Sequence, residues 1–211
     1  MAQAIHFDEL ANTLLRRGAG RRSITAIAGP PASGKSTLAE RLARQLNDAA
    51  AGSAAVLAMD GYHFDDLVLV QRGMRSRKGA PDTFDAAGLR HMLCRLKQNE
   101  EVEIAVPVFD RGLEIARAGA LLIPRSVRHL IVEGNYLLLD RTPWSDLLPY
   151  FDTTVMSVVP ETILRQRLTA RWQGYGLSPS EIATKIDGND LPNGRVVTGE
   201  SVAAEFALTE D

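Results

Sequence analysis

Apolar and polar positions follow two alternating patterns along this chain. Short apolar runs, which are typical of buried strands, occupy residues 23–28, 54–59, 130–132 and 154–159. Apolar residues three and four positions apart, which predict helices, occupy residues 7–17, 35–47, 85–98 and 161–173. Strands that alternate with helices predict an α/β fold in which helices cover both faces of a parallel sheet.

Two segments depart from this alternation. Between residues 103 and 124 the pattern is less regular, with candidate short strands at 104–109 and 120–123, and we interpret the segment as an insertion. The last dozen residues, after Val197, are expected to be loosely held. Because the sequence shows no internal repeat or linker, we expect residues 1–211 to form one domain.

Composition narrows the class of protein. The 211 residues are 45% hydrophobic and 24% charged, and no apolar run approaches the roughly 18 residues of a membrane span. The first residues lack the pattern of a signal peptide, and the single Cys94 cannot form an internal disulfide, so we expect a cytoplasmic protein. The formal charge of −2 argues against a general nucleic-acid partner, which would need a basic excess.

Residues 29–36 match G-x-x-x-x-G-K-[ST], the pattern of a phosphate-binding loop between a strand and a helix. The two glycines permit a tight turn whose N–H groups surround phosphate oxygens at a helix N-terminus. Lys35 can bridge the β- and γ-phosphates, and Ser36 can offer its hydroxyl to Mg²⁺. We therefore expect nucleotide contacts from Gly29, Pro30, Pro31, Ala32, Ser33, Gly34, Lys35, Ser36 and Thr37.

Two carboxylates follow predicted strands. Glu133 ends the run at 130–132, and Asp60 ends the run at 54–59, so both are expected at the edge where a parallel sheet places its ligands. Glu133 is then a candidate on the metal side, and Asp60 a candidate general base for an acceptor hydroxyl. The alternatives are a plain strand end at Glu133 and a simple Asp60-Gly61 turn.

Several segments carry a family resemblance. The phosphate loop, Met-Asp-Gly-Tyr-His at 59–63 and Val-Glu-Gly-Asn-Tyr at 132–136 resemble the P-loop kinases that include uridine kinase, phosphoribulokinase and bacterial pantothenate kinase. Segments 78–85, 107–111 and 189–193 are most similar to a bacterial branch described as fructose transport system kinases. Together these segments span residues 22 to 197, nearly the whole chain.

This resemblance implies a doubly wound, parallel, five-stranded sheet of the P-loop NTPase kind with a helical lid at residues 161–187. It implies Mg·ATP as the phosphoryl donor and a small hydroxylated molecule as the acceptor. The implied roles are Asp60 as base, Lys35 at the phosphates, Ser36 and Glu133 at Mg²⁺, and Tyr62, His63, Asp110, Arg111 and Glu133 around the acceptor.

The lid of such kinases closes over the phosphates with arginines. Arg167 and Arg171 lie four residues apart, hence on one helix face, and can neutralise charge on the transferring group, although a solvated basic face is the alternative. Asn189, Asp190 and Asn193 resemble the stretch that lies against adenine in relatives, or else form a turn-rich segment.

The acceptor is left open by the sequence. A sugar such as fructose is the first expectation, with a nucleoside or pantothenate as the second and a regulatory ATPase as a candidate of another class. A basic run in a glycine-containing loop can hold an anionic acceptor or be solvated, and solvation is slightly favoured for Arg72, Arg75, Arg77 and Lys78. The oligomeric state is also left open by the sequence, with a homodimer as a candidate because relatives often pair.

Overall fold

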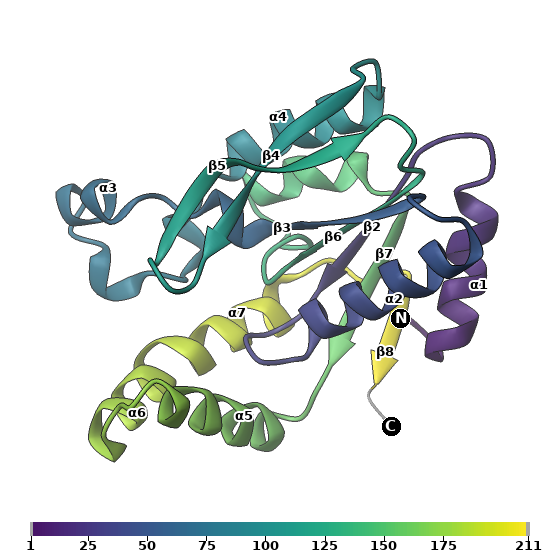
Figure 1. Cartoon of the computed structure of the whole chain (residues 1–211). Coiled ribbons are helices and arrows are strands. Elements are labelled where there is room, and N and C mark those ends of the chain that lie inside the picture. Colours follow the sequence, from purple (N-terminus) through teal and green to yellow (C-terminus); the bar gives the residue numbers. More distant parts are fainter. Residues whose placement is uncertain (1, 210–211) are drawn as a thin grey trace.

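The computed structural model describes residues 2–209 (Figure 1). Its strands are β1 (Gln3–Ala4), β2 (Ser23–Ala28), β3 (Ala54–Ala58), β4 (Glu103–Asp110), β5 (Ile115–Pro124), β6 (His129–Gly134), β7 (Thr153–Val158) and β8 (Phe206–Thr209). Its helices are α1 (Phe7–Arg17), α2 (Lys35–Ala49), α3 (Asp66–Gln71), α4 (Ala86–Gln98), α5 (Glu161–Gly174), α6 (Pro179–Lys185) and α7 (Leu191–Glu200). No helix in residues 2–209 is long and apolar enough to cross a membrane.

The central sheet is parallel and six-stranded, in the order β1-β8-β7-β2-β6-β3. Every residue of β2 and β6 is buried, which explains why these strands are continuous apolar runs without alternation. The predicted parallel α/β fold is confirmed, but the predicted count of five strands is wrong. The strands β1 and β8 extend one edge of the sheet, and at two and four residues they are too short to be recognised in the sequence.

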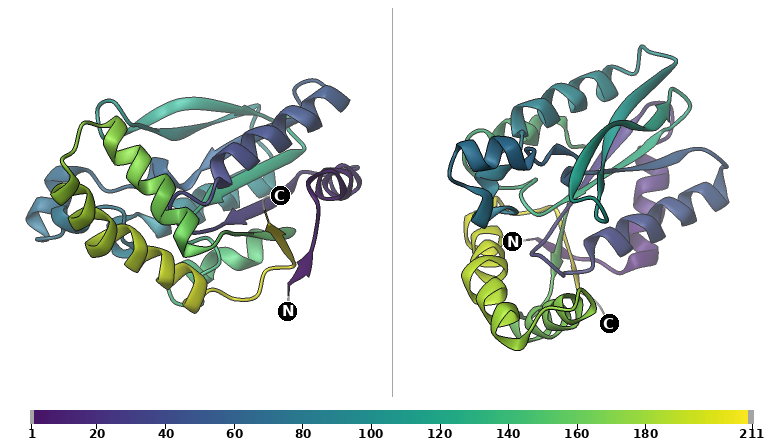
Figure 2. Two further views of the ribbon diagram at one scale, coloured as in Figure 1. Left: turned by 90° about the horizontal axis from the view of Figure 1, so that it is seen from below. Right: turned by 60° about the vertical axis from the view of Figure 1, so that its left-hand side comes forward.

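Two layers of helices cover the sheet (Figures 1 and 2). On one face, Leu10 of α1 and Leu42 of α2 pack with Ile131 of β6 in one apolar cluster. A second cluster joins Leu89 of α4 with Val132 of β6 and contains the buried residues of segment 136–147. Because successive positions of β6 belong to the two clusters, the sheet is buried on both sides, as the double winding requires.

The irregular segment 103–124 forms an antiparallel hairpin of β4 and β5, separate from the main sheet. Its register shifts between Val106 and Val108, at Pro107, which cannot donate a ladder hydrogen bond. The hairpin packs against the turn Met59–Tyr62 that follows β3. In Figure 1, the hairpin and α3 lie above the carboxyl end of the sheet, and α5, α6 and α7 lie below it.

Helices α5 and α6, joined to α7 by a π-helical turn at Ile186–Asp190, form a small unit of their own. Leu164 and Leu168 of α5 pack with Ile182 and Leu191 in a third apolar cluster, distinct from the two that flank the sheet. This unit leaves the sheet after β7 and returns to it through α7 and β8. The predicted helix at 161–173 is therefore part of a three-helix segment that can serve as a lid.

The C-terminal segment differs from the expectation. Helix α7 continues to Glu200, and β8 pairs in parallel with β7, from Val155 beside Phe206 to Val158 beside Thr209. Phe206 and Leu208 are buried in the cluster that also holds α1 and α2. The residues up to Thr209 are thus held by the sheet, because two apolar side chains in a four-residue strand suffice when a parallel neighbour is present.

Candidate active site

The phosphate-binding loop connects β2 to the N-terminus of α2. Ala32 and Gly34 adopt positive φ angles of 64° and 82°, and Gly34 caps the helix in a left-handed conformation. A Cβ at Gly29 would lie 2.5 Å from Oγ of Ser33, so the wrap leaves no room for a side chain there. The Ser157 hydroxyl donates to the carbonyl oxygen of Ser33 at 2.8 Å. The loop is therefore held in place, with helix N–H groups available to an anion.

Lys35 is the first residue of α2 and lies among carboxylates. Burial lowers the pKa of its ammonium group, while the charges of Glu133 and Asp60 act in the opposite direction. Its Nζ donates to the carbonyl oxygen of Pro30 at 3.4 Å, a long contact that leaves the ammonium free to turn to a ligand. A bound polyphosphate would favour the charged form of Lys35, because it adds negative charge to the same place.

The two predicted carboxylates come from neighbouring strands. Ala58 of β3 pairs with Glu133 of β6, and Asp60 follows two residues later, so the ends of the two strands meet at the loop. Glu133 is 6% exposed, and burial raises the pKa of its carboxyl while Lys35 and a hydrogen bond from Ser36 lower it. Asp60 is less buried and faces the other side, toward the hairpin.

This donor set fits a magnesium ion. Magnesium is commonly held by one or two protein carboxylates, a hydroxyl, substrate phosphates and water, and not by a protein cage. The Ser36 hydroxyl and the Glu133 carboxylate adjoin at the end of the phosphate loop. Consistently, the described residues 2–209 contain no cluster of three or more His, Cys, Asp or Glu side chains that could hold a metal alone.

The hairpin places Arg111 beside Asp60, the candidate general base. Arg111 lies in the turn between β4 and β5, and its Nη2 donates to Oδ2 of Asp60 at 2.7 Å. His63 lies between the rings of Phe84 and Phe109, with centroid distances of 3.9 and 4.8 Å. Its Nδ1 is 2.9 Å from the carbonyl oxygen of Asp60, which can only accept, so Nδ1 carries the proton. Burial lowers the pKa of His63, which favours the neutral ring.

Two residues that were predicted to surround the phosphoryl acceptor lie outside the cleft. Tyr62 is buried in the core cluster beneath the site, and its hydroxyl has no hydrogen-bond partner among the described residues. Asp110 closes the hairpin turn: its Oδ1 accepts from the N–H groups of Gly112 and Leu113, and its Oδ2 pairs with Arg117. Neither residue lines the cleft, so in this structure they shape the site and do not face an acceptor.

The lid carries cations to the opposite wall. Arg171 lines the cleft, and Nη1 of Arg167 donates to the carbonyl oxygen of Ala32 in the phosphate loop at 3.4 Å. Arg165, one helical face away, pairs instead with Asp187. Arg167 and Arg171, four residues apart, thus lie near the phosphate loop, whereas Arg165 does not. Their part in transfer stays a prediction.

The segment 189–193 forms the floor on the lid side. The Asn189 amide donates to the carbonyl oxygen of Lys78 at 3.0 Å and accepts from the amide of Asn193 at 3.1 Å. The Asp190 carboxylate accepts from Nε1 of Trp172 at 2.8 Å, and burial raises its pKa. All three predicted nucleotide contacts therefore border the cleft, although each is already hydrogen-bonded within the protein.

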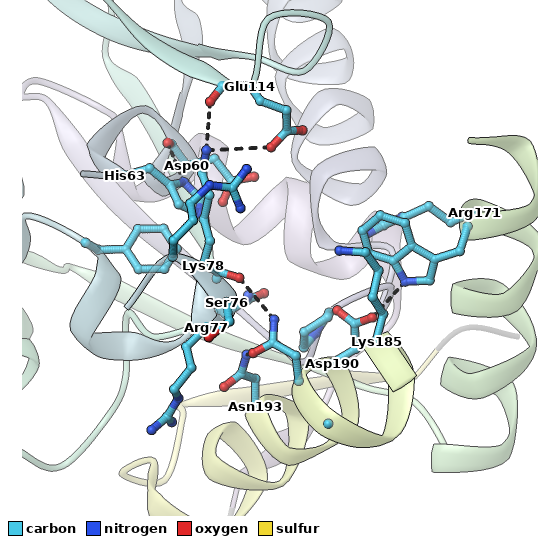
Figure 3. A pocket seen from close by; sticks show the side chains of 18 of the residues that line it. Asp60, His63, Ser76, Arg77, Lys78, Glu114, Arg171, Lys185, Asp190 and Asn193 are labelled. Carbon is cyan, nitrogen blue, oxygen red and sulfur yellow. Dashed lines mark hydrogen bonds and ion pairs between the residues drawn. The ribbon is translucent and has the colours of Figure 1, made fainter. Parts of the chain in front are cut away.

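The hairpin, the loop at residues 75–79 and the lid enclose a cleft of about 720 Å³, to which the phosphate loop contributes Pro31 (Figure 3). This volume is large enough for a nucleotide and a small acceptor. Figure 3 shows Asp60, His63 and Glu114 on one side and Arg171, Lys185 and Asp190 on the other. In the basic loop, Arg75, Arg77 and Lys78 line the cleft, whereas Arg72 lies over the ring of Phe64. Arg75 and Lys78 both pair with Asp66, but half of the Arg75 side chain stays exposed, whereas only 10% of the Lys78 side chain does.

Comparison with known proteins identifies relatives, although no family model matches the chain. The sequence is 30% identical to the "Putative uridine kinase C227.14" of Schizosaccharomyces pombe, over 97% of this chain and 90% of that protein. It is also 30% identical to the pantothenate kinase of Streptomyces avermitilis, over 69% of this chain and 46% of that protein. The crystal structure of a "putative fructose transport system kinase" from Silicibacter sp. TM1040 is 37% identical, with a TM-score of 0.89 over 97% of this chain and 99% of that one.

The chain belongs to the P-loop kinases related to uridine kinase and pantothenate kinase. The resemblance drawn from its motifs is confirmed. Two further relatives carry the words "ATP-dependent kinase" in their names.

Sequence reasoning about this P-loop kinase missed part of the cleft wall. Phe84, Phe109 and Asn135 line it, and all three stand inside the motifs that carried the resemblance, so a signal for them was present. Trp172 also lines the cleft, with the Lys185 ammonium 4.7 Å from its ring centroid. No pattern in the sequence indicated this pair.

Proposed function

We propose that this kinase transfers the γ-phosphoryl group of Mg·ATP to a hydroxyl group of a small metabolite, with a sugar as the first acceptor. The observation that carries the proposal is the position of Asp60. Its carboxylate lies at the end of β3, beside the phosphate loop, and is held by Arg111 from a hairpin that the phosphate loop itself does not need. Nucleotide binding by the phosphate loop does not by itself require this second wall, whereas an acceptor of the phosphoryl group must be held facing the phosphates.

Asp60 is the general base in this proposal. Arg111 holds the Asp60 carboxylate in place through a hydrogen bond of 2.7 Å from its Nη2 to Oδ2. An ionised carboxylate at this place can orient the acceptor hydroxyl and take its proton as the phosphoryl group is transferred. Arg111 also offers donors to the acceptor once the acceptor hydroxyl contacts Asp60.

Charge on the transferring group is countered from three directions. Lys35 reaches the phosphates from the loop, and Arg167 and Arg171 approach from the lid. Ser36 and Glu133 would hold Mg²⁺, which, when bound, neutralises charge on the β- and γ-phosphate oxygens.

The acceptor side favours a compact polar molecule. Aromatic rings of His63, Phe84 and Phe109 stand beside the donors and acceptors of Arg111 and Asp60, a combination that suits a hydroxylated ring with polar edges. The relative from Silicibacter, whose name refers to fructose, supports a sugar. The names of the other relatives support uridine or pantothenate as the second choice.

The test is release of ADP from Mg·ATP by the purified protein against sugars, nucleosides and pantothenate, run in parallel with Asp60→Asn. Strong stimulation by one compound, lost in the variant, is the expected result and names the acceptor. Slow hydrolysis that no compound accelerates would favour a regulatory ATPase and would overturn the proposal. Stimulation that survives in Asp60→Asn would leave the kinase but remove Asp60 as its base.

A further inference from the structure

Lys78 lies at a junction between the two walls of the cleft, although its side chain is not placed to act on a substrate. Only 10% of the side chain is exposed. Its Nζ donates to Oδ1 of Asp66 at 2.8 Å and to the carbonyl oxygen of Glu114 at 2.7 Å, and it lies 5.3 Å from the ring centroid of Phe109. Figure 3 shows the contacts between Lys78 and Glu114 as dashed lines. The ammonium group is therefore engaged in contacts within the protein.

The contact with Glu114 fixes the hairpin tip. Glu114 has a positive φ of 57° in the turn that carries Arg111, so a bond to its carbonyl oxygen restrains that turn directly. Asp110 sets the internal shape of the same turn by accepting from two of its N–H groups. With its shape set by Asp110 and its position set by Lys78, the turn brings Arg111 to Asp60.

The backbone of the same residue faces the lid. The carbonyl oxygen of Lys78 accepts from Asn189, which is bonded in turn to the buried Asn193 of α7. The next carbonyl oxygen, of Gly79, accepts from the Tyr136 hydroxyl at 2.6 Å, and Tyr136 is buried just beyond Glu133. One dipeptide thus contacts the hairpin, the lid segment and the end of the sheet.

We propose that Lys78 is a positioning residue, which ties the hairpin carrying Arg111 to the lid segment carrying Asn189. Ordering of the segment 189–193 by a nucleotide would then restrain the hairpin before the acceptor binds. This coupling needs no movement of the sheet, because both contacts are made by the same residue. The coupling itself does not depend on the proposed function. Only its expected effect on acceptor binding rests on that function.

The first test is hydrogen exchange of the hairpin tip, residues 109–117, in the wild type, Lys78→Met and Arg72→Met, each with and without Mg·ADP. Loss of a buried, charge-assisted donor should raise exchange at the tip by about tenfold in Lys78→Met. Arg72→Met removes the same charge from the same loop without touching the hairpin and should leave the tip unchanged. Mg·ADP should slow hydrogen exchange at the tip in the wild type and not in Lys78→Met.

Two further measurements separate positioning from general stability. With any acceptor found in the panel, Lys78→Met should raise the acceptor KM about tenfold and change the ATP KM by less than about twofold. Lys78→Gln, which keeps a shorter neutral donor, should be intermediate and serves as the second variant if Lys78→Met does not fold.

The possible results of these experiments lead to different conclusions. Equal exchange at the tip in the wild type and Lys78→Met, or no Mg·ADP effect on the tip of the wild type, overturns the coupling. A lower melting temperature with an unmoved acceptor KM assigns Lys78 a structural role only. If no compound stimulates any of the proteins, the proposed kinase function fails, while the exchange data still test the coupling by themselves.

Discussion

Arg111 and Asp60 are 51 residues apart in the chain and are joined by a 2.7 Å hydrogen bond between Nη2 and Oδ2. The bond links the carboxyl end of a strand of the main sheet to the turn of a separate hairpin. Both partners line the cleft and both keep part of their surface exposed. The pair is thus a contact between two structural units made at the place where an acceptor would bind.

The first prediction concerns the Asp60 side of this pair. Asp60→Asn keeps the shape and a hydrogen-bond acceptor for Arg111 but cannot take a proton. Turnover should fall at least about a hundredfold, the range expected for a general base, while ATP binding is retained. Steady-state ADP release and calorimetric titration with ATP measure the two quantities. Normal transfer by this variant would remove Asp60 from the role of base.

Arg111→Ala tests the other side. Loss of the guanidinium removes a donor from the acceptor and a cation from Asp60, so the acceptor KM should rise about tenfold or more, with little change in the ATP KM. The matched control is Arg117→Ala, because Arg117 is an equally exposed arginine of the same hairpin that pairs with Asp110. Equal effects of the two substitutions would assign Arg111 to the hairpin fold and not to the acceptor.

Lys35→Ala should behave differently from both. Lys35 is surrounded by the carboxylates of Glu133 and Asp60, and removal of its charge leaves them to repel a polyphosphate. Nucleotide affinity and turnover should therefore fall together. Titration with ATP beside single-turnover kinetics separates the two effects. Unchanged nucleotide affinity would show that the loop backbone holds the phosphates without this side chain.

Gly61→Ala tests how closely the hairpin approaches the base. A Cβ at this position would lie 2.6 Å from the carbonyl oxygen of Pro107 and 2.9 Å from its carbonyl carbon, both backbone atoms of β4. The hairpin must then move away from Asp60, and we expect a loss of stability of about 1–3 kcal/mol with a raised acceptor KM. Urea unfolding and steady-state kinetics measure the two.

The control for this substitution is Gly199→Ala, near the end of α7. Apart from the neighbouring residues and the backbone of its own helix, no atom lies within 4 Å of a Cβ there. Alanine is favoured over glycine inside a helix by roughly 0.5–1 kcal/mol. The stability of Gly199→Ala should be unchanged or slightly raised. If Gly61→Ala is equally harmless, the hairpin is free to shift, and its close packing on residues 59–62 does not set the position of Arg111.

The main sheet and the phosphate loop could be predicted because their signals are local. The apolar runs of β2 and β6 are buried at every position, and the helix at residues 7–17 begins and ends where its spacing indicates. The carboxyl ends of parallel strands lie at one edge, so Asp60 and Glu133 could be placed together without a structure. These inferences need only the period of the pattern and the rule for parallel sheets.

Long-range pairing accounts for what could not be predicted. The strand β8 has four residues and exists because β7 is beside it, which no window of sequence records. Tyr62 and His63 are neighbours in one motif, yet one is buried in the core and the other lines the cleft. Lys78 resembles its basic neighbours in sequence, and only the folded chain shows that its ammonium is bonded to Asp66 and Glu114.

The last prediction concerns pH. His129, at the start of β6, is 7% exposed, its Nδ1 has no partner in the described structure, and burial and Arg128 lower its pKa. In the unfolded chain the ring titrates near 6.5, so the unfolded state takes up the proton first as the pH falls. The contribution of His129 to stability is therefore full above about pH 6.5 and decreases below it, until the pH reaches the lower pKa of the folded state.

Urea unfolding of the wild type and His129→Gln at pH 8 and pH 5.5 measures this contribution as a difference. Carboxylates elsewhere titrate alike in both proteins and cancel. The wild type should lose more stability than the variant on acidification, because only the wild type has a buried imidazole whose protonation is disfavoured. An equal loss in the two proteins would mean that the ring is hydrated, or reorients to water, before the chain unfolds.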